Sequence, residues 1–488
     1  MASGKLTSKA LTQAYLARIK AIDKAGPRIN SVIAVNPDAL AIAVALDKER
    51  CEKGARGPLH GIPVLLKDII ATGDRMPNTA GSLALKDVRA IRDAFIVEKL
   101  RAAGAVILGK TNLTEWGNIR STRSTSGWSA LGGLTRNPYA LDRNTSGSSS
   151  GTGAAISASL AAVGVGGETD GSIIAPSHAN GLVGIKPTVG LVSRSGIIPI
   201  SSSQDTAGPM ARTVTDAAIL LTALAGTDPG DAVTREASER AVDYASALDR
   251  NALEGARIGV VRSNFGGRND LVAAQVEKAL QVMRDKGATL VDLRELPNAT
   301  KYVASEYEVF LYELKAGLPL YISGYAPHAP VKTLADVIAF NERERARELK
   351  YFGQEHFLKA EAKGGLDSPE YRAAMANNRK YSREEGIDKA LRENKLDALV
   401  APSGSPPWLT DFVRGDFSGG GFSQPAAVAG YPHITVPAGF VHGLPCGLSF
   451  VGTAWREPEL IAMAFAYEQA SQAWRAPRFA ASAAGEHV

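Results

Sequence analysis

The chain has little of several features that mark specialised classes of protein. It has only two cysteines, Cys51 and Cys446, in 488 residues, which excludes a secreted scaffold built on disulfides. It has no dense run of lysine and arginine and no motif of mixed aromatic and basic residues. Nucleic-acid binding is therefore not expected, although the formal net charge is +5. Its longest stretch of low charge, residues 146–167, has too few large apolar side chains for a membrane span.

Other absences narrow the choice further. No cysteine and histidine residues are spaced as zinc ligands, so neither a metal nor another cofactor is expected. Residues 1–24 show a charged, amphipathic helix pattern in place of a signal peptide, and we expect a cytoplasmic protein. The 146–167 stretch, rich in alanine, glycine and serine, predicts a buried helix that packs closely against other backbone.

What the chain does have is an alternation of short apolar strands with helical patterns. Its length allows two or three domains, but large α/β enzymes can form one unit, and we expect a single domain over residues 1–488. The patterns predict helices over 8–23, 36–53, 91–103, 152–160, 215–224, 271–286 and 460–472, and strands over 62–66, 106–108, 258–261, 289–291, 398–400, 433–436 and 448–450. This order predicts an α/β fold with a mixed central sheet and helices on both faces. Residues 231–394, mostly helical and polar, are expected to elaborate the sheet and shape the substrate pocket.

Three separated segments carry residues for nucleophilic chemistry. Ser148 lies in the serine- and glycine-rich segment 147–153, and Ser172, 24 residues later, ends the segment Glu168–Ser172. Lys67 ends the apolar run that begins at Gly61. A serine hydroxyl needs a base to become a nucleophile, and a lysine buried among apolar groups can stay neutral and serve as that base. Backbone N–H groups in a glycine turn can then bind a developing oxyanion.

Other interpretations compete for the same residues. Residues 147–151 satisfy the Gly-x-Ser-x-Gly pattern, which would make Ser149 the nucleophile of a hydrolase with a histidine base. The histidines that follow lie in no recognisable triad segment; they are His178, His328, His356, His433, His442 and His487. A phosphate-binding loop is disfavoured because neither glycine-rich nucleotide motif is complete. Lys67 could instead pair with Asp68 or Glu115, and Ser172 could cap a helix.

The ordered set of segments resembles the amidase signature family over nearly the whole chain. The matching segments are 60–68, 109–116, 147–153, 166–172, 184–188, 205–210, 430–432 and 436–437. The resemblance implies the fold of that family and a Ser–cis-Ser–Lys triad that needs no cofactor. It assigns the nucleophile to Ser172, the bridging cis-serine to Ser148 and the base to Lys67. It also implies an oxyanion hole formed by the backbone N–H groups of Thr169, Asp170 and Gly171.

Two positions depart from the commonest family pattern. Asp170 stands where many members have glycine, and Ile174 where many have arginine. The variant Glu-Thr-Asp-Gly-Ser, with segments 126–130, 187–190 and 203–206, looks like the peptide amidase branch, whose members remove the amide from C-terminally amidated peptides. Gln204 and Asp205 are expected to hold a turn near the site. The first eight residues resemble the interior of the family's first helical hairpin, so we expect a gene start further upstream or a trimmed one.

The resemblance predicts an amide-bond hydrolase acting through an acyl-enzyme on C-terminal peptide amides or similar small linear amides. One alternative is a broad aryl or alkyl amidase and esterase that also cleaves anilides or carbamates. Transamidation of tRNA-bound glutamate is a third possibility, against which Asp170 and Ile174 count. A protein that keeps the fold but only binds is an alternative of another class. The expected partner is a small amide or short peptide, with no nucleic acid or membrane, and the expected state is a monomer or homodimer.

Overall fold

A large mixed β-sheet organises the molecule. The computed structural model describes residues 1, 4–265 and 270–483. In these residues, 11 strands form one sheet. Their order across the sheet is β1 (Val32–Val35), β3 (Val106–Thr111), β2 (Pro63–Lys67), β6 (Val163–Glu168), β8 (Thr206–Ala211), β7 (Val183–Lys186), β12 (His433–Val441), β13 (Leu444–Val451), β11 (Ala398–Pro402), β9 (Arg257–Val261) and β10 (Thr289–Leu293).

Both strand directions occur in this sheet. Strand β2 runs parallel to its two neighbours, β3 and β6, while β6 and β8 are antiparallel. Strands β9, β10 and β11 form a second parallel group at the far edge. All residues of β2, β3 and β6 are buried, as expected for strands covered on both faces. The prediction of a mixed sheet in an α/β fold is confirmed.

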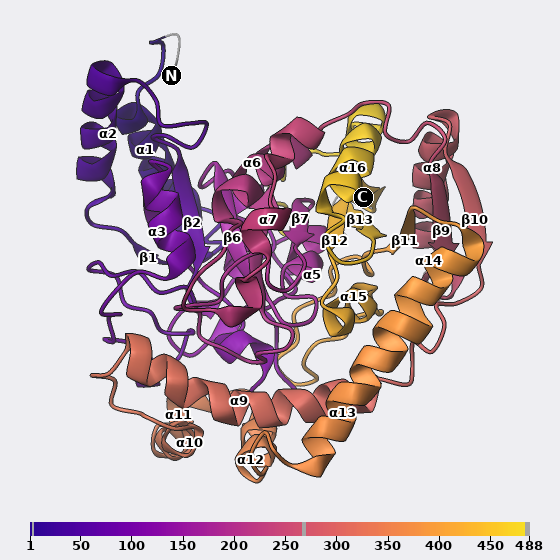
Figure 1. Ribbon diagram of the computed structural model, residues 1–488. Helices are drawn as coiled ribbons and strands as arrows, with labels where there is room; N and C mark the ends of the chain where they lie inside the picture. The colour runs from indigo at the N-terminus through magenta and orange to yellow at the C-terminus, as the bar shows by residue number, and fades with distance from the viewer. Residues whose placement is uncertain (2–3, 266–269, 484–488) are drawn as a thin grey trace.

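Helices cover both faces of the sheet (Figure 1). The α-helices are α1 (Ser8–Arg18), α2 (Ala39–Lys53), α3 (Phe95–Ala102), α4 (Ser150–Ser157), α5 (Ile174–Ala179), α6 (Val214–Leu224), α7 (Ala237–Arg240), α8 (Asp270–Asp285), α9 (Val303–Tyr325), α10 (Leu334–Arg343), α11 (Arg345–Glu348), α12 (Glu355–Glu361), α13 (Pro369–Arg379), α14 (Asp388–Asn394), α15 (Ser423–Ala429) and α16 (Glu457–Ser471). Because side chains alternate along a strand, Val64 and Leu66 of β2 enter one hydrophobic core and Leu65 enters the other.

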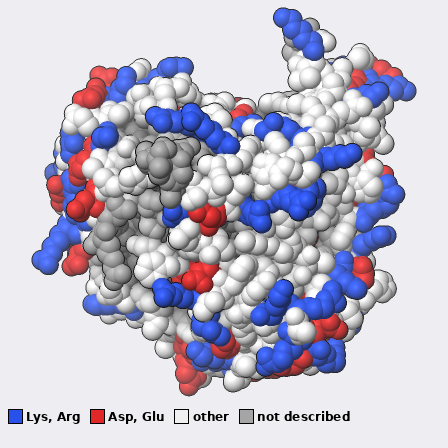
Figure 2. All heavy atoms as spheres, turned by 180° about the vertical axis from the view of Figure 1, so that it is seen from behind, with Lys and Arg blue, Asp and Glu red and all other residues white. Residues whose placement is uncertain are grey.

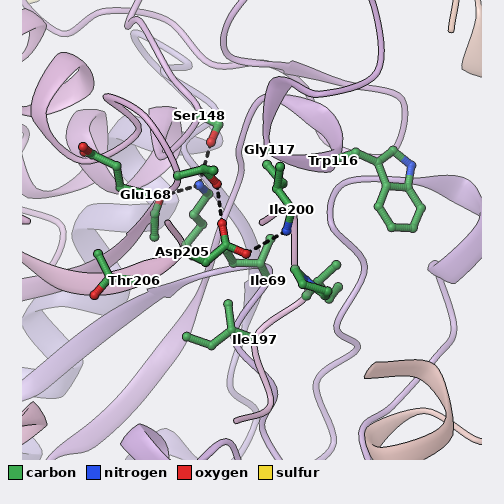
Figure 3. Close-up of a pocket in the computed structure, with 14 residues that line it drawn as sticks. Ile69, Trp116, Gly117, Ser148, Glu168, Ile197, Ile200, Asp205 and Thr206 are labelled. Atoms are coloured by element: carbon green, nitrogen blue, oxygen red, sulfur yellow. Dashed lines mark hydrogen bonds between the residues drawn. The ribbon is translucent and has the colours of Figure 1, made fainter. Parts of the chain in front are cut away.

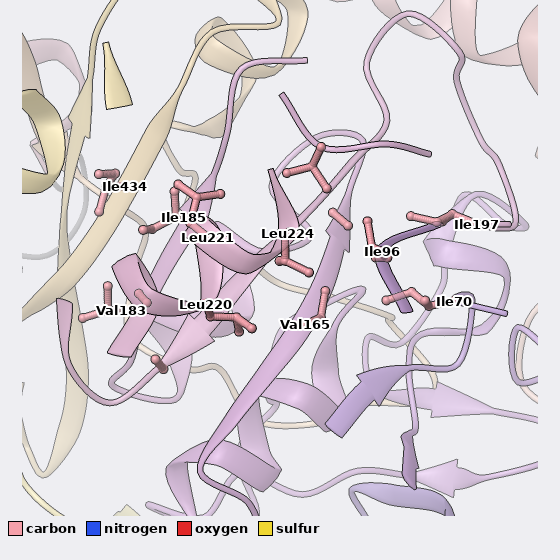
Figure 4. Close-up of a cluster of buried hydrophobic side chains, with 14 of the residues drawn as sticks. Ile70, Ile96, Val165, Val183, Ile185, Ile197, Leu220, Leu221, Leu224 and Ile434 are labelled. Atoms are coloured by element: carbon pink, nitrogen blue, oxygen red, sulfur yellow. The ribbon is translucent and has the colours of Figure 1, made fainter. Parts of the chain in front are cut away.

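The larger core packs α6 against the middle of the sheet. Thr213 caps α6 by accepting a hydrogen bond from the backbone N–H of Asp216, at 3.1 Å. Figure 4 shows Leu220, Leu221 and Leu224 of α6 beside apolar side chains of β6 and β7. This packing fixes β6, whose far end leads into the segment that carries Ser172.

The prediction for residues 146–167 was wrong in its second half. Helix α4 ends at Ser157, and strand β6 begins at Val163. A Cβ atom at Gly166 would lie 2.8 Å from the Met210 sulfur, and one at Gly167 would lie 2.7 Å from Ile69. These glycines make the strand hard to recognise from the sequence. They are needed because neighbouring side chains leave no room for a Cβ atom.

Some further elements differ from the sequence prediction. Strands β1, β7 and β8 were not predicted, while α2 begins at Ala39 and α3 at Phe95, a few residues later than expected. The 231–394 stretch contributes strands β9 and β10 and then the helices α9 to α14. In Figure 1, α9 crosses one end of the sheet, and α13 and α14 rise along its edge.

The surface carries both signs of charge. Figure 2 shows lysine and arginine side chains interspersed with acidic ones over one face of the molecule. In the part of the chain that the structure describes, no helix is both long enough and apolar enough to cross a membrane.

Candidate functional site

Lys67 is a buried residue at the carboxyl end of β2. Its side chain is 1% exposed, and its Nζ donates hydrogen bonds to Ser148 Oγ at 2.7 Å and to the Gly167 carbonyl at 2.8 Å. Among the described residues, Lys67 forms no ion pair with a carboxylate within 4.0 Å; Asp68 bonds to Thr79, and Glu115 pairs with Arg120. Burial lowers the pKa of Lys67 to about 7, although the charges of Asp205 and Glu168 oppose this shift.

Ser148 is held in a tight loop that precedes α4. The peptide bond between Gly147 and Ser148 is cis, as the family resemblance implied. A Cβ atom at Gly147 would lie 2.2 Å from Thr114 Oγ1, so only glycine fits there. The Ser148 carbonyl accepts a hydrogen bond from the Thr114 N–H at 3.0 Å. These contacts fix the Ser148 hydroxyl against Lys67.

Ser172 ends a turn, residues 168–172, that follows strand β6. The Ser172 carbonyl accepts a hydrogen bond from the Ser149 N–H at 3.1 Å, which joins the turn to the Ser148 loop. Glu168 Oε2 accepts hydrogen bonds from the N–H groups of Ile173 and Ile174, at 2.6 and 3.0 Å. Gly171 has φ of +74°, a conformation that favours glycine. The turn is therefore fixed on both sides of Ser172.

The backbone N–H groups of this turn have no acceptor in the part of the chain that the structure describes. No oxygen of the described residues accepts a hydrogen bond from the N–H groups of residues 169–172. Unpaired N–H groups that follow one another in a turn form a site for negative charge. The turn therefore has the donors that an oxyanion would need.

Asp205 holds the turn from the neighbouring strand. Thr206, the next residue, pairs with Glu168 in the sheet, which brings Asp205 beside Thr169. The Thr169 hydroxyl donates a hydrogen bond to Asp205 Oδ1, and Asp205 Oδ2 accepts from the Ile200 N–H at 2.8 Å. Burial raises the pKa of Asp205 to about 6. Asp205 thus holds the turn, as predicted.

Two cavities are lined by residues of these segments. One, of about 20 Å³, is lined by Lys67, Ser148 and Thr169, and Figure 3 labels Ser148 and Asp205, which both line it. Another, of about 230 Å³, is lined by Gly147, Asp170 and neighbouring residues. The smaller has room for about one water molecule. The larger can hold a small organic group.

Comparison with known proteins decides the family. A family model described as Amidase matches residues 10–461. The chain belongs to the amidase family. The predictions of an amidase signature fold and of an amide-hydrolysing enzyme are therefore confirmed.

Individual relatives place this amidase near peptide amidases. Native peptide amidase from Stenotrophomonas maltophilia is 51% identical, with a TM-score of 0.93 over 98% of this chain and 96% of that chain. Peptide amidase PAM in complex with the competitive inhibitor chymostatin has the same identity and coverage and a TM-score of 0.95. A probable amidase of Arabidopsis thaliana is 42% identical over 98% of this chain and 89% of its own length. The A subunit of glutamyl-tRNA(Gln) amidotransferase from Halorhodospira halophila is 34% identical over 96% and 94%.

Ser149 and two of the histidines occupy structural positions in this amidase. Ser149 is fully buried and bonds to Gly167 twice, donating to its carbonyl at 3.1 Å and accepting from its N–H at 3.2 Å. His60 Nε2 lies 2.9 Å from the Leu46 carbonyl, and His178 Nε2 lies 2.7 Å from the Ser405 carbonyl. His487 lies outside the described residues.

Sequence reasoning missed two polar residues beside the turn, Glu306 of α9 and Gln424 of α15. Glu306 is 4% exposed and bonds to both Gln204 and Gln424. Glu306 sits in a charge-rich stretch whose pattern is typical of a solvated helix, so no local signal marked it as buried. The lining residues of the two cavities lie outside 231–394, and the role of that stretch in shaping the pocket stays a prediction.

Proposed function

We propose that this amidase hydrolyses amides through an acyl-enzyme on Ser172, with Ser148 as the bridging hydroxyl and Lys67 as the base. The observation that carries the proposal is the 2.7 Å contact between Lys67 Nζ and Ser148 Oγ, made by a buried lysine whose pKa is lowered to about 7. A lysine in this state is neutral in a large fraction of molecules at physiological pH, and its lone pair can take a proton.

The proposed reaction begins with proton transfer along the serines. Neutral Lys67 takes the Ser148 proton, Ser148 takes the Ser172 proton, and Ser172 Oγ attacks the substrate carbonyl carbon. Negative charge then develops on the carbonyl oxygen, where the N–H groups of Thr169, Asp170 and Gly171 stabilise it. The same relay returns a proton to the departing ammonia or amine, and water cleaves the acyl-enzyme by the reverse sequence.

The proposed substrates are C-terminal peptide amides. The 51% identity to peptide amidase over 98% of this chain supports this choice. The cavity of about 230 Å³ beside Gly147 and Gly171 is the proposed place for the acyl part of the substrate, and its glycine and serine walls favour a short, linear chain. Other relatives are A subunits of glutamyl-tRNA(Gln) amidotransferase. The departures at Asp170 and Ile174 disfavour that tRNA-dependent reaction for this chain.

A substrate panel tests both the nucleophile and the substrate class. Wild type, Ser172→Ala and Ser149→Ala are assayed on an amidated dipeptide, its methyl ester, an anilide and an aryl carbamate. We expect wild type to prefer the amidated dipeptide, Ser172→Ala to lose at least about 10⁴-fold on every substrate, and Ser149→Ala to keep activity. An active Ser172→Ala with an inactive Ser149→Ala would overturn the proposed nucleophile. A preference for the anilide or carbamate would replace the substrate class.

A further inference from the structure

A single buried carboxyl group connects helix α9 to the 168–172 turn. Glu306, in the first turn of α9, accepts a hydrogen bond from Gln204 Nε2 on Oε1, at 2.9 Å. Its other oxygen, Oε2, accepts from Gln424 Nε2 of α15 at 2.6 Å. Both oxygens are therefore occupied, by side chains from two segments far apart in sequence.

Gln204 contacts the turn directly, and Gln424 follows a residue that lies close to it. Gln204 Nε2 also donates to the Thr169 carbonyl at 3.3 Å. On the other side, Ser423 precedes Gln424, and its hydroxyl lies 2.9 Å from where a Gly171 Cβ atom would be. Glu306 thus fixes Gln204, which bonds to Thr169, and Gln424, whose neighbour Ser423 lies close to Gly171. Thr169 and Gly171 are the two ends of the row of proposed oxyanion donors.

We propose that Glu306 is a positioning residue for oxyanion stabilisation, which holds the 168–172 turn through Gln204 and Gln424. The inference rests on the proposed function of that turn. It does not make Glu306 a catalytic residue, because no contact joins it to the reacting atoms.

The charges around Glu306 explain why its protonation matters. Asp170 of the turn faces it, with the Tyr302 phenol at the N-cap of α9 and the Gln204 and Gln424 amides. Around Asp170 lie Glu168 and Lys186. Burial, reinforced by the charge of Asp170, raises the pKa of Glu306 to about 8. Above that pH Glu306 adds a second buried negative charge, besides that of Asp170, close to the turn. This charge repels the negative charge that develops on the oxyanion.

The test measures how fast a fluorophosphonate labels Ser172 between about pH 6 and about pH 10. Labelling needs the nucleophile and the turn but no amide substrate. In wild type we expect the rate to rise as Lys67 loses its proton near pH 7 and to fall again near pH 8 as Glu306 ionises. In Glu306→Gln the fall at high pH should disappear, and the rate at neutral pH should be about tenfold lower, because one amide donor loses its acceptor.

Two further variants sharpen the test. Glu308→Gln, in the same helix, removes a partner of Lys363 near the surface and should keep the wild-type profile. Gln424→Met removes a hydrogen bond that lowers the pKa of Glu306, so the fall should move to higher pH. This variant tests the inference even if Glu306→Gln does not fold.

The outcomes separate the inference from the proposed function. If Glu306→Gln or Gln424→Met keeps the wild-type fall at high pH, the inference is overturned, and Lys186 becomes the group to examine. If wild type itself is not labelled on Ser172, the proposed function fails and the inference fails with it.

Discussion

Two lysines on adjacent strands are buried to the same degree but have different surroundings. Lys67 ends β2 at 1% exposure, and Lys110 lies in β3 at 0%. Lys110 donates hydrogen bonds to the Ile70 carbonyl and to Asn78 Oδ1, and the charge of Asp68 faces it. Lys67 instead donates to one carbonyl and to the Ser148 hydroxyl.

The difference shows that burial alone does not produce a base. Burial lowers the pKa of both lysines, to about 7 for Lys67 and about 8 for Lys110, where Asp68 opposes the shift. The partners decide the role, because a carbonyl or an amide oxygen can only accept from Lys110, whereas the Ser148 hydroxyl can give a proton to Lys67. On this account Lys67 does chemistry and Lys110 supports structure.

The largest expected effect comes from Lys67→Met. Without the base, hydrolysis of an amidated dipeptide should fall by about 10⁴-fold or more. The variant should still fold. Folding lowers the pKa of Lys67 from 10.5 to about 7, so burying this lysine costs free energy at neutral pH. Replacing it with methionine removes that cost. Assays of kcat and thermal melts check both. Substantial activity in this variant would contradict the role of Lys67.

Ser148→Ala should have the next largest effect. Removing the bridge leaves Lys67 without a path to Ser172, and we expect a loss of about 10³-fold in kcat with little change in KM. Steady-state kinetics provide the measurement. A change confined to KM would mean that Ser148 only contacts substrate.

Lys110→Met should give the opposite pattern to Lys67→Met. The variant leaves the Ile70 carbonyl and Asn78 Oδ1 without their donor and removes the charge facing Asp68, which should cost about 2–4 kcal/mol of unfolding free energy. Activity of the folded protein should stay within about tenfold of wild type. Denaturant titration and kinetics distinguish the effects. Loss of activity without loss of stability would contradict the structural role assigned to Lys110.

The sequence located the residues of the candidate site better than the strand next to them. The ordered segments led to Lys67, Ser148 and Ser172, because their order and spacing are specific even where each segment is weak. Strand β6 was missed because its glycines are required by neighbours that no local pattern shows, such as Met210 and Ile69. Glu306 was missed for the same reason, since its partners come from segments about 100 residues away.

A smaller effect distinguishes the carboxylates beside the two lysines. The charge of Asp205 raises the pKa of Lys67, so Asp205→Asn should lower that pKa. The pH at which activity rises should then move down by roughly several tenths of a pH unit. Asp68→Asn should leave the rise in place, because Asp68 acts on Lys110. The pH dependence of kcat/KM measures the shift in each variant. Equal shifts in Asp205→Asn and Asp68→Asn would contradict the claim that each carboxylate acts on a different lysine.

The smallest effect is expected for Ser149→Ala. The hydroxyl bonds only to the Gly167 backbone, so its loss should cost about 1 kcal/mol of stability and less than about tenfold in activity. Thermal melts and kinetics provide the check. Complete inactivation of a stable Ser149→Ala would revive Ser149 as the nucleophile.

The most direct test of the central claim is to locate the covalent adduct. Wild type and Lys67→Met are treated with a fluorophosphonate near neutral pH, digested, and the labelled peptide is identified by mass spectrometry. We predict an adduct on Ser172 in wild type and almost none in Lys67→Met. An adduct on Ser149, or equal labelling of Ser172 without Lys67, would contradict the account.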